Sequence, residues 1–378
     1  MRIFIIPILI LLLLPRGAQA QPAPTVVKVP PTILNALPRE DVLVGLSRPL
    51  LMSVLQTQHT NELLGFINDL HLRPKVFDSD DGDAGDVLLG LEFDYRKSIV
   101  NRVLSEASRN PMGISLAIEA KGDVAANARK NPNNLLEGTV GAHFFQGLGG
   151  IDPHYAPSPE AQLNLQRAIF ASTTNKAAYA AAAREFTAHM RPQFFYDVQG
   201  HASLETDQQF HDKQWVYGGK VGLAFRDWRA RSDVGWFNIL DYPFAALRWL
   251  VNKEDFQPSG RTFPSLIAGL DLVDPSDNDS RLAIDANGDA YPRARVELGF
   301  KTPVMEWRTE QLYVSAGFRW FQEFGASDAI KGAGLDHSEF FAIKLDLPYK
   351  FNASYATGKL PLDGNNDQVY ALGWSLDF

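Results

Sequence analysis

The carboxyl end of the chain alternates strictly between two kinds of side chain, and this period constrains the fold more than any other feature. Over residues 368–378, one set of positions is large and apolar or aromatic: Tyr370, Leu372, Trp374, Leu376 and Phe378. The positions between them hold Ala371, Gly373, Ser375 and Asp377. Because successive side chains of a β-strand point to opposite faces, the segment is predicted to be a strand with one apolar face.

The same period recurs along the chain from residue 86 onward, which predicts a large antiparallel sheet. The clearest predicted strands cover residues 89–96, 114–123, 136–144, 194–205, 215–226, 293–301, 311–320, 341–347 and 351–355. Weaker candidates cover residues 234–240 and 266–273. With the terminal strand they give about 12 strands, and an even number is typical of single-chain bacterial barrels.

The composition of the two strand faces indicates which face meets lipid. A soluble sandwich also alternates, but its apolar face is turned inward. Here the polar faces mix acids and bases with small residues, as a watery or packed lumen does, and the apolar faces are rich in Phe, Tyr and Trp, as lipid-interface girdles are. The pattern therefore favours an all-β fold, a single antiparallel transmembrane β-barrel of about 12 strands, within a range of about 10 to 14.

The terminal strand also carries a resemblance to a known class of proteins. Because it ends on the aromatic Phe378, it resembles the closing strand of a Gram-negative outer-membrane β-barrel. The resemblance implies that Phe378 is an assembly signal, that the barrel assembly machinery binds this strand, and that outer-membrane lipids surround the protein.

The amino-terminal residues predict export. Residues 1–20 combine an early charge at Arg2, an apolar run over residues 3–14 and small residues before Gln21. This is the pattern of a secretory signal peptide, and the run is too short to cross a bilayer with margin. We expect a protein that passes through the inner membrane and resides in the Gram-negative outer membrane.

The rest of the chain divides into an extension and the barrel. Residues 21–85 begin Pro-rich and continue with helical spacing, which predicts a short, partly helical periplasmic extension, a plug-like segment in the barrel, or a linker with an incidental helix. Residues 86–378 are expected to form the barrel. Within them, the Ala-rich stretch 146–192 predicts a long helical loop on the extracellular side that enters the lumen or covers its mouth.

Composition excludes several classes of function. The formal net charge is −8, which argues against nucleic acid as a partner, because phosphate binding needs clustered Lys and Arg. The chain has no cysteine and no His-Glu-x-x-His spacing or phosphate-cradling glycine loop, so no cofactor is expected.

The predicted barrel is best interpreted as a passive pore or small-solute channel, with charged side chains lining the lumen. The residues expected to set selectivity are Arg293, Arg295, Glu297, Lys301, Arg319, Lys344, Lys220, Glu92, Asp94, Asp197 and Glu205. Opposite charges in a narrow barrel can also pair and fill it. A structural or adhesive barrel with a filled lumen is therefore an alternative hypothesis.

An enzymatic alternative comes from the tripeptide His201-Ala202-Ser203. It resembles the His-x-Ser pair of outer-membrane phospholipase A and the lipid A 3-O-deacylases, which implies a histidine base and a serine nucleophile in a lipid-modifying acyl hydrolase. Asp212, or Gln214 as an alternative, is the candidate third residue that would orient His201. Those enzymes present the pair toward lipid, whereas His201 and Ser203 fall on the polar face here, which favours a lumen-lining position.

Acidic clusters offer hard oxygen ligands of the kind that Ca²⁺ prefers. The candidate ligands are Asp78, Asp80, Asp83, Asp277, Asp279, Asp285 and Asp289. No stretch gives a complete EF-hand loop, and Asp-, Asn- and Gly-rich turns explain the same composition. No metal is therefore expected.

Overall fold

The computed structural model describes residues 70–79, 88–105, 112–126, 134–151, 190–227, 233–252, 255–260, 262–307, 310–363, 366–374 and 376–377. The predicted signal peptide, most of the predicted extension, residues 152–189 of the predicted helical loop and Phe378 lie outside these described residues.

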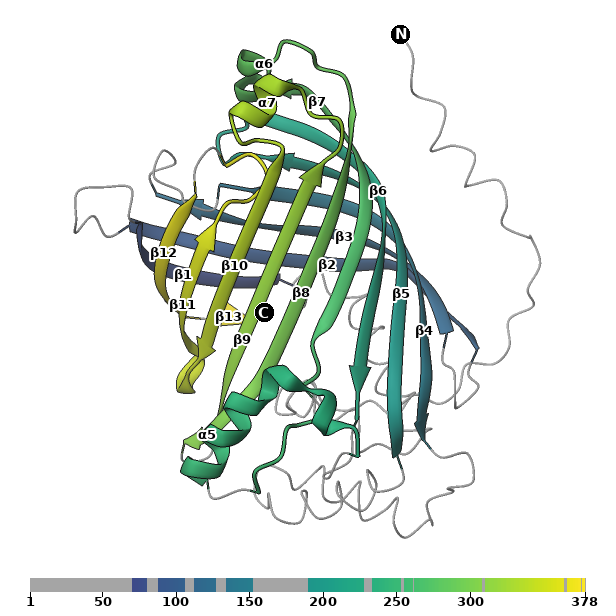
Figure 1. Cartoon of the computed structure of the whole chain (residues 1–378), viewed down its shortest axis with the longest axis vertical. Helices are drawn as coiled ribbons and strands as arrows, with labels where there is room; N and C mark the ends of the chain where they lie inside the picture. The colour runs from purple at the N-terminus through teal and green to yellow at the C-terminus, as the bar shows by residue number, and fades with distance from the viewer. Residues whose placement is uncertain are drawn as a thin grey trace.

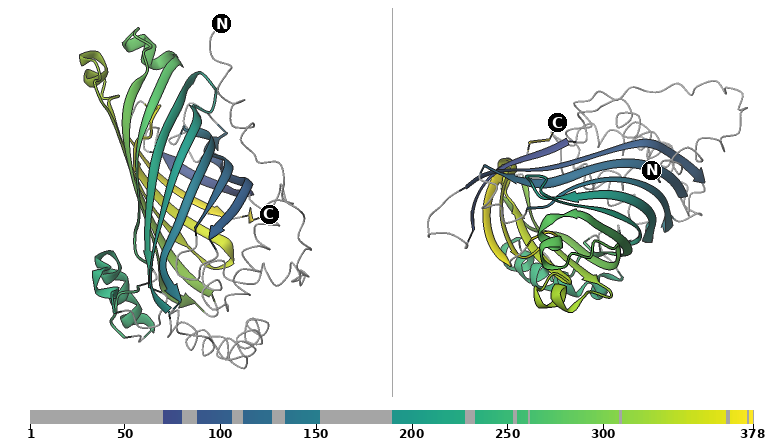
Figure 2. Two further views of the ribbon diagram at one scale, coloured as in Figure 1. Left: turned by 90° about the vertical axis from the view of Figure 1, so that its right-hand side faces the viewer. Right: turned by 90° about the horizontal axis from the view of Figure 1, so that it is seen from above.

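Twelve long antiparallel strands form a closed barrel (Figure 1, Figure 2). They are β1 (Leu70–Ser79), β2 (Leu88–Ser105), β3 (Met112–Ala125), β4 (Leu136–Ile151), β5 (Met190–Thr206), β6 (Asp212–Arg226), β7 (Ser265–Asn278), β8 (Tyr291–Trp307), β9 (Glu310–Glu323), β10 (His337–Asp346), β11 (Phe351–Gly358) and β12 (Asp367–Trp374). Each strand pairs with its sequence neighbours, and β12 pairs with β1 to close the ring. A short β13 (Leu376–Asp377) continues along β1.

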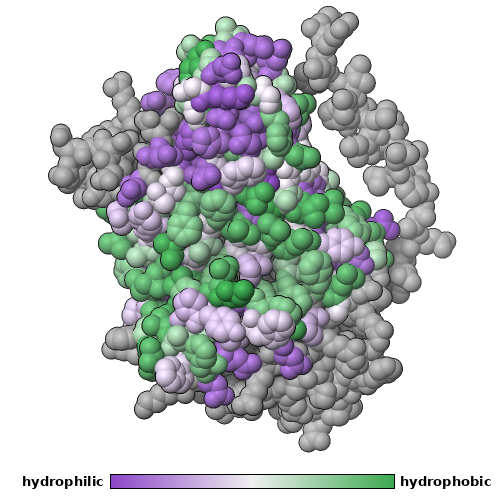
Figure 3. Space-filling model, viewed as in Figure 1, coloured by the Kyte–Doolittle hydropathy of each residue, from purple (hydrophilic) through white to green (hydrophobic). Residues whose placement is uncertain are grey.

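Alternation along the strands separates an apolar exterior from a polar interior. In β7, Leu270 and Leu272 are exposed, whereas Asp271 between them is buried. In β8, Leu298 is exposed while Arg293 and Arg295 are buried. This distribution is inverted relative to a water-soluble protein, in which charged residues are the exposed ones. Figure 3 shows the result on the face in view as a broad apolar band across the barrel wall, with hydrophilic residues gathered toward the α6/α7 side of it.

An apolar band on a closed barrel is the arrangement that lets strands cross a bilayer, because every strand edge is paired and the outer side chains meet hydrocarbon. The chain is an outer-membrane-type β-barrel. Within the described ranges, no helix has the length and apolar character needed to cross a membrane.

Helices mark the two ends of the barrel. At one end lie α6 (Asp279–Ile284), between β7 and β8, and α7 (Asp328–Gly332), between β9 and β10 (Figure 1). We refer to this as the α6/α7 end. The opposite end, the α5 end, carries the 3-10 turns η2 (Gly235–Phe237) and η3 (Ile239–Asp241), then α5 (Tyr242–Asn252) and the tight turn η4 (Pro348–Lys350).

Two strand predictions are corrected by the structure. Residues 234–240 are not a strand, because they form η2 and η3 instead. Conversely, β1 lies inside the segment 21–85 that was expected to precede the barrel, so the described barrel starts at Leu70 rather than at residue 86. The two errors compensate, which is why the expected number of strands is nevertheless correct. The weaker candidate 266–273 is confirmed as part of β7.

Because residues 234–240 are not a strand, the predicted helical loop connects at the other end of the barrel from the one expected. Strands β4 and β5 pair at Ile151 and Met190, so the connection 152–189 joins the same end of the barrel as the connection that contains α5. The predicted extracellular placement of residues 146–192 counted residues 234–240 as a strand, so it is wrong in that count: without this strand the loop connects at the end that carries the short turn η4. The ends of that stretch, up to Ile151 and from Met190, belong to β4 and β5.

Candidate functional site in the barrel lumen

Every charged residue expected to line the lumen lies on an inward-facing strand position. These residues are Glu92 and Asp94 in β2, Asp197 and Glu205 in β5, Lys220 in β6, Arg293, Arg295, Glu297 and Lys301 in β8, Arg319 in β9 and Lys344 in β10. Their part in selectivity stays a prediction. The structure adds that inward-facing charged residues differ in exposure: some are buried in an ionic cluster, and others keep contact with solvent.

The first group is a buried ionic cluster centred on Arg293. Its guanidinium donates two hydrogen bonds to the Glu205 carboxylate, from Nη2 to Oε1 at 2.7 Å and from Nη1 to Oε2 at 3.0 Å. Nη2 also lies 3.2 Å from Oδ2 of Asp271. These side chains are almost completely buried. Because β6 and β7 separate Glu205 from Arg293, the contact spans a chord of the lumen and braces the wall.

Further partners extend this cluster on both sides. Arg295 pairs with Glu297 and lies 3.8 Å from Asp271, and Arg319 approaches Glu297 at 3.7 Å. Gln214 Nε2 donates to Glu205 Oε2 at 2.6 Å. Bidentate and charge-assisted bonds of this kind are the strong ones, and they offset the cost of removing several charges from water.

Glycines on the inner face create the room that these side chains occupy. A Cβ added to Gly218 in β6 would lie 2.3 Å from Asp271 Oδ1. One added to Gly141 in β4 would lie 2.3 Å from Gln199 Nε2. At Gly218 the Leu270 carbonyl oxygen would also lie 2.7 Å away, so a larger residue is excluded by backbone, whereas at Gly141 the Gln199 side chain would have to shift.

The second group of lumen residues keeps contact with solvent inside the closed barrel. The exposed fraction of the side chain is 56% for Arg96, 49% for Lys301, 40% for Asp197 and 35% for both Lys121 and Arg319. They lie on five different strands, β2, β8, β5, β3 and β9. These charged side chains of the described lumen lining therefore keep contact with solvent, unlike those of the buried cluster.

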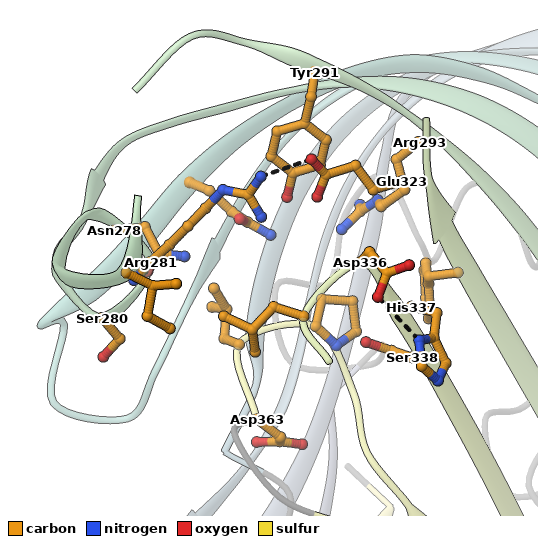
Figure 4. A pocket seen from close by; sticks show the side chains of 16 residues that line it. Asn278, Ser280, Arg281, Tyr291, Arg293, Glu323, Asp336, His337, Ser338 and Asp363 are labelled. Atoms are coloured by element: carbon orange, nitrogen blue, oxygen red, sulfur yellow. Dashed lines mark hydrogen bonds and ion pairs between the residues drawn. The ribbon is translucent and has the colours of Figure 1, made fainter. Parts of the chain in front are cut away.

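A cavity of about 190 Å³, lined by both charged and apolar side chains, lies at the α6/α7 end, and Arg293 forms part of its wall (Figure 4). Arg281 from α6 reaches across it to Glu323, with Nη2 2.7 Å from Oε1, and its guanidinium lies 4.2 Å from the Tyr291 ring centroid. Arg281 Nε, Arg293 Nε and Glu323 Oε2 have no hydrogen-bond partner among the described residues. The mouth of the barrel thus combines aromatic and charged groups with spare hydrogen-bonding capacity.

Sequence reasoning missed several residues of this site. Asp271 lies in a predicted strand between Leu270 and Leu272, and that alternation could have identified it as an inward acid. Arg281 and Glu323 had no comparable signal, because their ion pair joins α6 to the end of β9, which is distant in the sequence.

The residues of the hydrolase hypothesis are inward but do not form a catalytic arrangement. Ser203 Oγ is paired with Thr139 Oγ1 at 2.8 Å, and His201 Nε2 lies 3.3 Å from Asp271 Oδ1. The third candidate, Asp212, accepts from the Ser280 hydroxyl at 2.6 Å at the α6/α7 end. No described contact links Asp212 to His201, and both members of the pair are buried away from the lipid face.

The calcium candidates within the described residues do not converge. No group of three or more acidic or histidine side chains in the described ranges could hold a metal ion together. Asp285 instead accepts from the Ser327 hydroxyl at 2.6 Å and from the Asn287 N–H at 3.1 Å, and these bonds lower the pKa of its carboxyl. Asp80 and Asp83 lie outside the described residues, and for Asp78 only the strand backbone is described.

Comparison with known proteins finds similarity only among solved barrels. No protein-family model matches the sequence, and no curated protein matches it. The outer membrane phospholipase A from Escherichia coli is 8% identical with a TM-score of 0.34, and covers 84% of this chain and 96% of its own. The NanC porin is 8% identical with a TM-score of 0.32, and covers 82% and 100%.

The KdgM porin gives a similar result, at 7% identity and a TM-score of 0.27, and covers 82% of this chain and 99% of its own. TM-scores this low carry no argument about function. They leave the assignment of the barrel to the chain's own strand pairing and apolar exterior.

Proposed function

We propose that this protein is a passive pore for small hydrophilic solutes across the outer membrane. The observation that carries the proposal is the solvent exposure of charged side chains inside a closed barrel. A filled lumen would bury Arg96, Lys121 and Arg319 as completely as it buries Arg293. Charged groups that stay hydrated line a path on which polar solutes keep their own hydration.

The buried cluster gives this path its shape. Arg293, Glu205 and Asp271 hold β8, β5 and β7 together, so the cluster acts as a rigid wall and leaves the remaining lumen to water. The accessible lining carries both signs, with Arg96, Lys121, Lys301 and Arg319 against Glu92, Asp94 and Asp197. Such a lining favours polar solutes over apolar ones and gives only modest preference for one sign of charge.

Uptake into lipid vesicles tests the proposal. Purified protein in phospholipid vesicles should admit small neutral and charged sugars, with rates that fall as solute size increases. Replacing two accessible bases, as Lys121→Glu and Arg319→Glu, should slow anionic solutes and speed cationic ones. The control is Lys331→Glu, which makes one such charge reversal on α7, where the side chain is exposed outside the lumen; it is compared with Lys121→Glu alone.

A second candidate function, a structural barrel with a closed lumen, is favoured by one observation. The Arg293 cluster is fully buried and internally paired, as it would be in a barrel selected for rigidity. The two candidates differ in one measurable outcome. Folded protein that admits no solute of any size would support the structural barrel and refute the pore.

A further inference from the structure

The outer surface of the barrel carries a helical segment at the α5 end, made of η2, η3 and α5. Figure 2 shows α5 outside the barrel wall rather than over the lumen. The helix packs on the outer face of β8: Ala245 is buried, and the rings of Phe244 and Phe300 lie 5.8 Å apart between centroids. The segment therefore has one face against the barrel and one face away from it.

The face against the barrel holds all of the segment's charge. Between residues 234 and 252 the only charged residues are Asp241 and Arg248. They pair with each other at 2.7 Å, Thr302 Oγ1 donates to Asp241 at 2.6 Å, and Arg248 Nη1 donates to the Pro303 carbonyl at 2.8 Å. Asp241, Arg248 and Thr302 are buried. Charge is thus neutralised beneath the helix instead of being presented outward.

The face away from the barrel is apolar and exposed. The exposed fraction reaches 75% for Ile239, 67% for Leu250 and 59% for Trp236. The other exposed apolar residues of this face are Phe237, Leu240, Leu247, Trp249, Val251 and Phe256. Soluble surfaces rarely expose contiguous apolar patches beyond a few hundred Å², so this face is expected to have an occupant.

We infer that the exposed face of the α5 segment is embedded in the lipid leaflet at the α5 end. Continuity with the barrel exterior supports lipid as the occupant. The helix lies over Phe300 and Thr302, on the same outward face of β8 that presents Leu298 to the bilayer. A helix satisfies its own backbone hydrogen bonds in hydrocarbon, and Trp and Tyr are enriched at the interface where its rings lie.

This lipid-embedded segment differs from an ordinary interfacial helix. Such helices turn a basic face toward headgroups and water. Here the polar face covers the barrel wall, so the segment widens the apolar perimeter of the protein at this depth. Attachment to lipid is then driven by apolar area, and anionic lipid is not required.

Site-specific labelling tests this inference directly, because the chain contains no cysteine. A fluorescent label at Leu250→Cys, in protein reconstituted into phosphatidylcholine vesicles, should be quenched by brominated acyl chains, as a label at Leu298→Cys should be. A label at Ala286→Cys, exposed at the α6/α7 end, should not be quenched. Quenching at position 250 that matches position 286 would overturn the inference.

A second measurement separates lipid from protein as the occupant in cells. A photo-crosslinking residue placed at Trp249 should yield lipid adducts in native membranes. A discrete adduct with another protein, or with a second copy of this chain, would contradict the inference. Both experiments leave Arg248 and Asp241 intact, so the packing of the helix on the barrel is not disturbed.

Discussion

Leu298 offers a direct test of the exterior assignment, because it lies near the middle of β8 and points outward. It is the eighth of the strand's 17 residues, and 43% of its surface is exposed. At about 3.4 Å per residue and a tilt of about 40°, each residue advances roughly 2.6 Å along the barrel axis. Leu298 therefore lies within about 3 Å of the strand's midpoint, close to the bilayer centre.

Leu89 supplies the matched control. It is also an outward leucine, 65% exposed, but it is the second of the 18 residues of β2. The same arithmetic places it about 20 Å from its strand's midpoint, beyond the half-height of an apolar band about 25 Å tall. Arginine should thus cost about 2 to 4 kcal/mol of folding free energy at Leu298 and about 0 to 1 kcal/mol at Leu89.

The assay is reversible urea unfolding in phospholipid vesicles, followed by tryptophan fluorescence. The difference between Leu298→Arg and Leu89→Arg removes the common cost of losing a leucine. Equal destabilisation by the two substitutions would refute the reasoning, because it would mean that depth in the bilayer does not govern the cost.

Three further results are expected. Arg293→Met should lower the free energy of unfolding by about 3 to 5 kcal/mol, because it leaves the buried Glu205 carboxylate without its partner. Adding Glu205→Gln should recover part of that loss in a urea double-mutant cycle. Additive effects would mean that the two side chains are not energetically coupled. Ser203→Ala should cost about 1 kcal/mol for its lost hydrogen bond and leave membrane lipid composition unchanged; altered acyl chains would revive the hydrolase hypothesis. The hydrogen bond from the Ser327 hydroxyl lowers the pKa of Asp285, so the ionised carboxylate stabilises the fold above about pH 3.9, and this stabilisation is lost as pH falls through the lowered pKa. Ser327→Ala should raise the pKa of Asp285 toward about 3.9 in an NMR titration. An unchanged pKa would contradict the role given to this hydrogen bond.

Which side chains of a strand point into the lumen could be predicted from the sequence, because successive side chains of a strand must point to opposite faces. Once β8 is extended, Arg293 and Arg295 must share one face and Leu298 must take the other. The structure confirms this division. The polarity of the lumen is therefore a local property of each strand.

Strand β1 could not be predicted in the same way. Pro74 lies in its middle, and a proline argues against a central strand because it lacks the N–H that a ladder needs. The strand is held instead by β12 on one side and β2 on the other. Closure of the barrel overrides the local signal, and closure cannot be seen in a single segment.

Residues 234–240 misled in the opposite direction. Their aromatic and branched residues favour a strand, but polar bonds to Ser259, farther along the chain, hold them in the 3-10 turns η2 and η3. Asn238 Nδ2 donates to the Ser259 carbonyl at 2.8 Å, and the Ser259 N–H donates to Asp241 at 2.6 Å. Pro243 then lies in the first turn of α5, where its missing N–H costs nothing.

The pairing of Arg293 with Glu205 was also beyond sequence reasoning. Both residues were expected in the lumen, but which acid meets which base depends on the stagger between strands that are not neighbours. The sequence therefore predicts which residues line the lumen. It does not predict which of them form the buried cluster and which stay exposed to solvent.

Single-channel recording in a planar bilayer tests the proposed pore most directly. Purified protein should produce discrete current steps in symmetric salt, and Arg319→Glu should shift the reversal potential in a salt gradient toward cation preference, because this side chain lines the accessible path. Protein that folds and inserts normally but passes no current, or whose reversal potential ignores Arg319→Glu, would contradict the account.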